Sequence, residues 1–216
     1  FLTEAMNVVN ERKRPYIVME GMSDRFMATY KRPFEAKDIK VVMYAGGLHE
    51  RYGLKKLTEA FMMLPQENFR LKLFGSGPFV EKLKTKYTKK DSRIQYMGVA
   101  PNAEVVAAEL DASLLVNPRP THEEFTKYSF PSKNIEYMAS GTPLLTTKLP
   151  GMPKEYYPYV FLIENESVEG YAKALESVLA QSDEELYVFG EKAKDFVLEK
   201  KNSFEQAKRV IELIKL

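Results

Sequence analysis

The sequence has 216 residues, which is enough to bury one substantial core but not to form two full domains. It has no cysteine and two histidines, which excludes a disulfide framework and a thiolate metal site and leaves too few ligands for an all-histidine metal centre. Its 32 basic and 30 acidic side chains leave a net charge of +2, which gives no indication of a nucleic-acid partner.

The first 40 residues are expected to be largely irregular. Residues 3–11 are typical of a short helix, residues 16–19 of a short strand, and the polar stretch 23–40 of a connector. Because the sequence begins on Phe1 in the middle of this pattern, we expect it to be a fragment of a longer protein. No signal peptide and no apolar run of ~18 residues is evident, so the cytoplasm is the expected location.

From residue 41 onward, short apolar runs alternate with helical patterns. The predicted strands are residues 41–45, 71–74, 93–97, 112–116, 142–146 and 159–163. A helix is predicted after each of the first four strands, and three more are predicted at residues 167–180, 183–200 and 203–215. This alternation is typical of βαβ units. It predicts an α/β fold, a doubly wound, Rossmann-like parallel sheet with helices on both faces.

Two glycine-rich strand ends are candidate ligand sites. Parallel sheets of this kind bind ligands beyond the carboxyl ends of their strands, near the point where the strand order reverses. Gly46 and Gly47 end one predicted strand, and Gly75 and Gly77 end the next. Glycines there let the backbone approach a ligand, although glycines also end strands for turn geometry alone. The dinucleotide fingerprint and the P-loop are absent, which weakens a nicotinamide or an ATPase function.

A second candidate is the helix that begins near Pro131. Proline suits the first turn of a helix, and the free N–H groups of Ser132 and Lys133 would then form an anion site at the positive end of the helix dipole. Lys133 adds a full positive charge, and Glu136 lies one turn further along, where its carboxylate can accept hydrogen bonds from hydroxyls. A sugar nucleotide requires both features. The alternative is an ordinary amphipathic helix with a solvated lysine and glutamate.

Residues 128–143 resemble the most recognisable segment of glycosyltransferase family 4 (group 1). In that family an E-x(7)-E motif runs into a helix that ends in a small-Ser/Ala-Gly-x-Pro phrase. Glu136 matches the second glutamate, and residues 139–143 (Ala-Ser-Gly-Thr-Pro) match the phrase. Residues 41–61, 71–78 and 94–118 resemble the preceding segments of the family in the same order. The resemblance covers about residues 19 to 170 and implies the C-terminal, nucleotide-sugar-binding domain of a two-domain (GT-B) enzyme.

The resemblance also implies a role for each candidate residue. Glu136 would bind the ribose hydroxyls of the donor, the backbone just before the helix would hold the diphosphate, and the loop after the third strand would meet the base. Lys133 and Arg51 would be the catalytic cations. The donor-binding residues would be Gly46, Gly47, Gly75, Gly77, Gly98, Val99, Ser129, Phe130, Pro131, Ser132 and Glu136.

Three positions depart from the family pattern. The first glutamate of the motif falls at Tyr128, the usual arginine of the first glycine turn at Gly47, and the usual lysine at Tyr52. Arg51 is displaced by one residue and is a candidate substitute, since a guanidinium suits a diphosphate. Glu123 or Glu124 is a candidate for the missing carboxylate, and the sequence does not decide between them.

The implied function is that of a retaining glycosyltransferase. It would move a hexose from a nucleoside-diphosphate sugar to an acceptor hydroxyl in surface polysaccharide or lipopolysaccharide synthesis, without a metal or other cofactor. Residues 1–35 would end a missing acceptor domain and form the linker, residues 36–182 would bind the donor, and residues 183–216 would pack on that domain or back on the missing one. The sugar or lipid-linked acceptor would bind to the missing domain, and the full enzyme would be cytoplasmic or at the inner face of the membrane.

Two other functions are compatible with the same fold. A degenerate domain would bind a nucleotide sugar, or only a partner, without transferring anything, as the substitutions at Gly47, Tyr52 and Tyr128 favour. A sugar-nucleotide epimerase would require more ionisable side chains aimed into the cleft than the sequence places there.

Overall fold

The computed structural model describes residues 10, 13–32 and 34–215, and in them a parallel six-stranded sheet forms the centre of the fold. The strand order is β3-β2-β1-β4-β5-β6, so the order reverses between β1 and β4. The strands are β1 (Lys40–Ala45), β2 (Phe69–Phe74), β3 (Ile94–Gly98), β4 (Leu114–Asn117), β5 (Leu144–Thr147) and β6 (Phe161–Ile163). The predicted doubly wound α/β fold is confirmed, and each of the six predicted strands is present within a few residues of its expected position.

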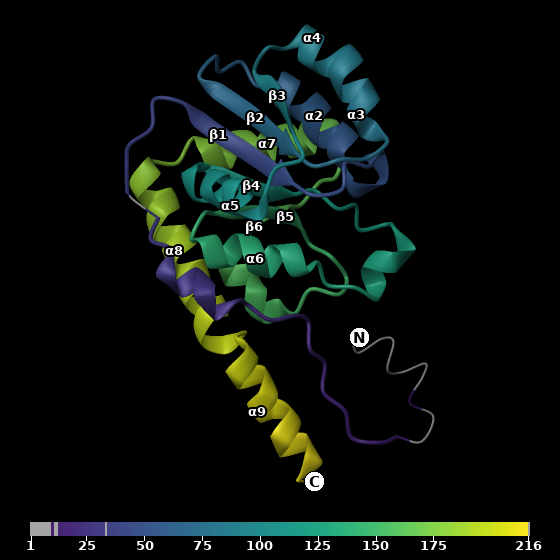
Figure 1. The fold of residues 1–216 in the computed structure, drawn as a ribbon. Coiled ribbons are helices and arrows are strands. Elements are labelled where there is room, and N and C mark those ends of the chain that lie inside the picture. The colour runs from purple at the N-terminus through teal and green to yellow at the C-terminus, as the bar shows by residue number, and fades with distance from the viewer. Residues whose placement is uncertain (1–9, 11–12, 33, 216) are drawn as a thin grey trace.

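Helices cover both faces of this sheet (Figure 1). They are α2 (Leu54–Met62), α3 (Phe79–Lys82), α4 (Thr88–Lys90), α5 (Asn102–Asp111), α6 (Ser132–Ser140), α7 (Val168–Leu179), α8 (Asp183–Lys200) and α9 (Ser203–Ile214). Shorter turns are η1 (Arg25–Thr29), η2 (Glu50–Tyr52), η4 (Glu124–Lys127) and η5 (Lys154–Tyr159), and the π-helical turn η3 (Leu83–Tyr87) joins α3 to α4. The three predicted C-terminal helices are confirmed as α7, α8 and α9.

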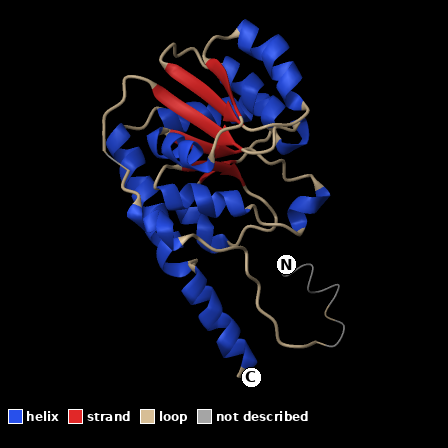
Figure 2. Cartoon of the chain, viewed as in Figure 1, coloured by secondary structure: helices blue, strands red, loops and turns tan. Residues whose placement is uncertain are grey.

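Helices lie on both faces of the sheet (Figure 2), and the core consists of two layers of buried side chains, one on each face. Alternate residues of β1 divide between them: Val42 and Tyr44 pack with α2, α3 and α7, whereas Met43 and Ala45 pack with α5, α6 and α8. The central strands β1, β4 and β5 are buried on both faces, whereas β2 alternates apolar residues with the half-buried Arg70 and Lys72. The continuous apolar runs of β1 and β4 made these two strands the easiest to locate from the sequence.

The N-terminal part differs from expectation. The predicted strand at residues 16–19 is wrong, because this segment pairs with α9 instead of joining the sheet. Arg209 Nη2 donates to Val18 O (3.0 Å) and Gln206 Nε2 donates to Gly21 O (3.3 Å). In the predicted connector, η1 begins where Asp24 Oδ1 accepts from Phe26 N at 2.8 Å. The predicted helix at residues 3–11 lies outside the described residues, except for Asn10.

The C-terminal helices and the N-terminal segment also meet at a joint around Ser23 and Lys201. Ser23 N donates to Lys201 O (2.8 Å), and Ser23 Oγ donates to Val197 O (2.7 Å). Lys201 is buried there and its Nζ pairs with Glu20 Oε1 (3.3 Å) and Glu155 Oε1 (2.6 Å). From this joint α9 extends away from the sheet (Figure 1). Among the described helices, none is both long and apolar enough to cross a membrane.

Candidate functional site

The candidate site lies at the carboxyl edge of the sheet, where β1 and β4 end side by side. Helix α6 begins at this end of the sheet, and buried side chains of the helix form hydrogen bonds with the last residues of both strands. Ala45 N donates to Tyr137 Oη (2.8 Å), and Tyr137 Oη donates to Ala45 O (3.1 Å). Asn117 Nδ2 at the end of β4 donates to Asn134 Oδ1 at 2.6 Å. Because Tyr137, Asn117 and Asn134 are buried, the start of α6 has a fixed position relative to the switch in strand order.

Lys133 and Glu136 form the charged pair of this helix. Lys133 Nζ lies 3.6 Å from Glu136 Oε2, and the two side chains are 27% and 39% exposed, so both are accessible to a ligand. A Cβ atom on Gly46 would lie 3.2 Å from Lys133 Cε, which shows that the lysine side chain extends over the end of β1. The structure therefore brings together three residues predicted from the sequence.

The backbone before α6 is free of side-chain caps. Pro131 has an extended conformation (φ −67°, ψ 112°) and is the N-cap, and no described side chain accepts from the first turn of the helix. Ser132 is exposed, whereas Ser129 Oγ donates to Phe125 O (2.9 Å) and the Phe130 ring packs on Tyr156 with centroids 4.9 Å apart. Ser129 and Phe130 thus use their side chains to hold the loop. Their contact with a diphosphate through the backbone stays a prediction.

Two of the candidate glycines have a packing reason for their identity. A Cβ atom on Gly75 would lie 1.9 Å from Gly46 O, and one on Gly77 would lie 2.3 Å from Leu48 O. The φ angles of Gly75 and Gly77, +124° and +152°, also lie where side chains are disfavoured. Both glycines are therefore required by the close approach of neighbouring loops, whether or not a ligand also touches them.

The loop after β3 is open. Gly98 has φ +79°, and a Cβ atom there would meet nothing within 4 Å. Val99 is 74% exposed, while Ala100 packs against the second layer of the core. An exposed apolar residue beside an open glycine is compatible with contact to a base, and that contact stays a prediction.

The turn after β1 holds a cluster of aromatic and cationic side chains. The Cζ atom of Arg51 lies 5.2 Å from the centre of the Tyr52 ring, and its Nη2 is 3.5 Å from Tyr52 Oη. Arg119, from the loop after β4, lies 5.0 Å from the same ring and 5.7 Å from the Phe125 ring. Gly47 is exposed beside this cluster. Arg51 was predicted from the sequence as a cation of the site, whereas Arg119, which lies between Pro118 and Pro120, was not among the predicted site residues.

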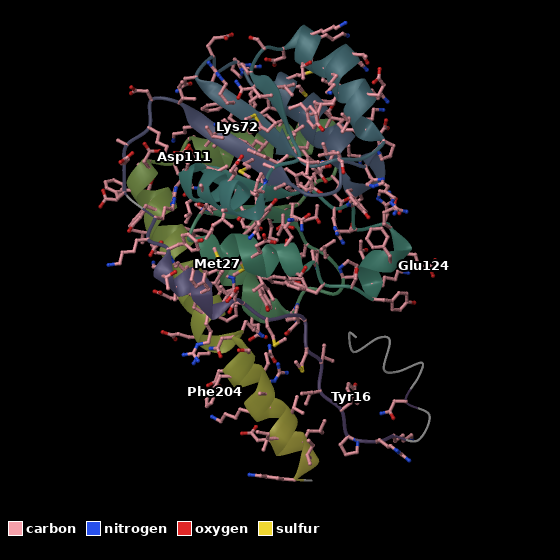
Figure 3. All side chains as sticks on the ribbon, in the orientation of Figure 1. Tyr16, Met27, Lys72, Asp111, Glu124 and Phe204 are labelled. Carbon is pink, nitrogen blue, oxygen red and sulfur yellow. The ribbon has the colours of Figure 1, made fainter. Side chains whose placement is uncertain are left out.

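The carboxylates expected to replace the missing glutamate do not pair with the candidate cations. Tyr128, at the position of that glutamate, is 44% exposed. Glu123 Oε1 lies 3.9 Å from His122 Nε2, and Glu124 is exposed at the outer part of its loop (Figure 3). Within the described residues, neither forms an ion pair with Lys133 or Arg51.

Sequence reasoning missed Glu109, a glutamate buried on α5. Neither of its carboxylate oxygens has a hydrogen-bond partner among the described protein groups. Burial, with the charge of Glu136 in addition, raises its pKa to about 8, and Lys133 acts in the opposite direction. Its burial could have been inferred from helical spacing, because Glu109 follows the buried Val106 by about one turn and therefore lies on the same face of α5.

A metal site is not evident in the part of the chain that the structure describes. No group of three or more His, Asp or Glu side chains there is close enough to hold an ion. The expected independence from metals stays a prediction.

Comparison with known proteins supports the resemblance seen in the sequence. Over 112 residues the chain is 30% identical to the putative colanic acid biosynthesis glycosyltransferase WcaL of Escherichia coli (strain K12). That match covers 50% of this chain and 27% of WcaL, so the chain corresponds to only part of that relative.

Solved structures share the fold. Sucrose-phosphate synthase from Thermosynechococcus elongatus has a TM-score of 0.75 at 19% identity, over 98% of this chain and 55% of that chain. A TarM variant from S. aureus, solved with UDP, has a TM-score of 0.74 at 17% identity, over 98% of this chain and 42% of that chain. Anabaena HepE, solved with UDP and glucose, has a TM-score of 0.63 at 16% identity, over 82% of this chain and 48% of that chain.

The family assignment comes from a broader match along the sequence. The family described as glycosyl transferases group 1 matches residues 28–215, which include the sheet, the charged pair on α6 and the C-terminal helices. Because this match covers most of the sequence, the chain belongs to the glycosyl transferases group 1 family.

Proposed function

We propose that this chain is the donor-binding half of a retaining glycosyltransferase that moves a hexose from a nucleoside-diphosphate sugar to an acceptor hydroxyl. The observation that carries the proposal is the accessible Lys133–Glu136 pair at the uncapped start of α6, with Lys133 over Gly46. A cation and free N–H groups suit a diphosphate, and a carboxylate one turn away suits the hydroxyls of the attached ribose.

Catalysis on this proposal is mainly positional and electrostatic. When the bond between the sugar and the diphosphate breaks, negative charge grows on the leaving phosphate oxygen. The backbone N–H groups at the start of α6 and the cations Lys133 and Arg51 stabilise that charge, because they are already in place and need little reorganisation. The acceptor sugar or lipid-linked acceptor would bind to a part of the enzyme outside this chain.

The biological setting is proposed by analogy. WcaL is named as a putative colanic acid biosynthesis enzyme, which supports a role in surface polysaccharide or lipopolysaccharide synthesis. TarM and HepE were solved with UDP, which makes a uridine nucleotide the first donor to test. We place the whole enzyme in the cytoplasm or at the inner face of the membrane, with no metal cofactor.

Calorimetric titration of the 216-residue chain with UDP, GDP and ADP tests the proposal. We expect one nucleotide to bind with a micromolar-to-millimolar Kd and Glu136→Ala to weaken that binding by about tenfold or more, since the ribose loses a charged acceptor. The control is Glu212→Ala, an exposed glutamate on α9, which should leave Kd unchanged. A folded chain that binds none of the three nucleotides would contradict the proposal.

A degenerate binding domain is the second candidate. It is favoured by Tyr52, which stands at the position of the family's usual lysine. The Tyr52 ring already carries the guanidinium groups of Arg51 and Arg119. Sugar transfer by the whole protein distinguishes the two functions. Nucleotide binding without any transfer would support the degenerate domain.

A further inference from the structure

The loop after β4 is held directly against the turn after β1. Gly53 has φ +85°, and a Cβ atom there would lie 1.8 Å from Pro118 O, so only glycine fits at this contact. The next residue along the β4 loop is Arg119, and Thr147 Oγ1 donates to its carbonyl oxygen at 2.5 Å. The backbone of Arg119 is therefore fixed on both sides, and its side chain starts next to Tyr52.

The Arg119 guanidinium is stacked but not neutralised. Its Cζ atom lies 5.0 Å from the centre of the Tyr52 ring and 5.7 Å from that of Phe125. Within the described residues it forms no ion pair with a carboxylate, and the residue is only half-buried. Stacking on aromatic rings orients a guanidinium while leaving its N–H groups available for an anion.

Arg119 and Lys133 approach the same loop from two different elements. A Cβ atom on Gly46 would lie 3.1 Å from Tyr44 Oη and 3.2 Å from Lys133 Cε. Tyr44 Oη donates to Gly47 O at 3.1 Å, and the charge of Arg119 opposes the burial that raises the pKa of Tyr44. The Arg119 charge thus acts on the end of β1 that Lys133 also covers.

A side chain at Gly47 would meet the rings of His49 and Tyr52. A Cβ atom there would lie 3.3 Å from His49 Cδ2 and 3.4 Å from Tyr52 Cε2. His49 and Tyr52 pack edge to face with their ring centres 5.1 Å apart, so two aromatic rings lie beside the glycine turn. The positive charge at this turn comes instead from side chains that lie on the Tyr52 ring.

We propose that Arg119 is a cation of the donor site that binds the diphosphate together with Lys133, and that Tyr52 is the positioning residue that holds it. This inference rests on the proposed function, because it assumes that the ligand at the β1–β4 edge is a nucleoside diphosphate. A planar guanidinium with free N–H groups matches two phosphate oxygens at once, which a lysine does not. Removal of Arg119 should therefore affect recognition of the phosphates and not of the nucleoside.

The test compares Arg119→Gln with the wild-type 216-residue chain. Calorimetry measures Kd for UDP, uridine and inorganic diphosphate. If GDP or ADP binds more tightly than UDP, that nucleotide and its nucleoside replace UDP and uridine. We expect Arg119→Gln to weaken the binding of the nucleotide and of inorganic diphosphate by roughly tenfold to a hundredfold, and to reduce the salt dependence of Kd. The Kd for the nucleoside should stay unchanged. Arg25→Gln, an exposed arginine on η1, is the matched control and should behave as wild type.

A second variant tests the role of Tyr52. Tyr52→Leu keeps both arginines but removes the ring on which they lie. We expect a weaker Kd for the diphosphates with the salt dependence retained, because the charges remain but are less well oriented.

Two results would overturn the inference, and they are distinguishable. If Arg119→Gln lowers the melting temperature but leaves the binding of the nucleotide and of inorganic diphosphate intact, while Glu136→Ala weakens nucleotide binding, Arg119 is only a loop anchor and the proposed function stands. If the folded wild-type chain binds neither the nucleotides nor inorganic diphosphate, the proposed function fails and the role of Arg119 fails with it.

Discussion

Glu109 is a single residue whose burial makes stability depend on pH. Its folded pKa of about 8 lies above the ordinary value of 4.5, so between these values the folded state holds a proton that the unfolded state has lost. By linkage, stability then falls as pH rises, by up to about 1.4 kcal/mol per pH unit across this window. We expect Glu109→Gln to remove this slope and to be more stable than wild type at pH 8.

Denaturant unfolding at several pH values between 5 and ~8.5 measures this effect. The control is Glu104→Gln, which changes an exposed glutamate on the same helix and should keep the wild-type slope. An unchanged slope in Glu109→Gln would show that the carboxyl group is solvated or hydrogen-bonded in solution.

At this scale the sequence predicted some site residues and not others. Lys133 and Glu136 were predictable because both lie on one helix, so their relation follows from helical spacing, and the pair is observed at 3.6 Å. Arg119 and Glu109 were not, because their importance depends on residues far away in the sequence. Arg119 meets Tyr52 only through the contact between Gly53 and Pro118.

At the scale of elements, Tyr137 is the connection between helix α6 and strand β1. Its hydroxyl both accepts from Ala45 N and donates to Ala45 O in a fully buried position. We expect Tyr137→Phe to cost about 1–3 kcal/mol, because two buried backbone groups lose their partner. We also expect nucleotide affinity to fall, since Lys133 and Glu136 are placed by the same helix.

Chemical denaturation and calorimetric titration check the two halves of this prediction. Tyr128→Phe is the control, because it removes the hydroxyl of an exposed tyrosine and should change the free energy of unfolding by less than about 0.5 kcal/mol. A Tyr137→Phe variant as stable as wild type would show that the hydroxyl does not fix α6.

The elements themselves were largely predictable. Most of the strands appear in the sequence as short apolar runs, and helical segments follow the first four of them, so the strands could be counted without knowing their order. The segment at residues 16–19 was misjudged for the same reason. A short apolar run indicates burial but not its partner, and here the partner is helix α9, whose Arg209 donates to Val18 O.

For the whole molecule, Lys201 joins three parts of the chain that are far apart in sequence. Its Nζ pairs with Glu20, whose side chain is 5% exposed, and with Glu155. We expect Lys201→Met to cost about 3–5 kcal/mol in the free energy of unfolding, because the buried carboxylate of Glu20 loses its partner. Glu20→Gln in the same chain should recover part of that loss.

Denaturant unfolding of the single and double variants measures this coupling. The neighbouring exposed residue provides the control, since Lys200→Met removes the same charge without uncovering a buried carboxylate. Equal stability of the Lys200 and Lys201 variants would show that the buried ion pairs contribute nothing to the joint.

The same joint has a consequence for the synthesis of the protein. The segment around Ser23 pairs with Val197 and Lys201, and Ser23 Oγ reaches a carbonyl 174 residues further along the chain. At ~5–20 residues per second, a ribosome needs about 9–35 s to make that stretch. During this interval the sheet can assemble and the early segment can already pack on α6, where Gly21 faces Ile135, but Ser23 still lacks its partners at Val197 and Lys201. The hydrogen bonds of Ser23 should therefore be among the last to form in the cell.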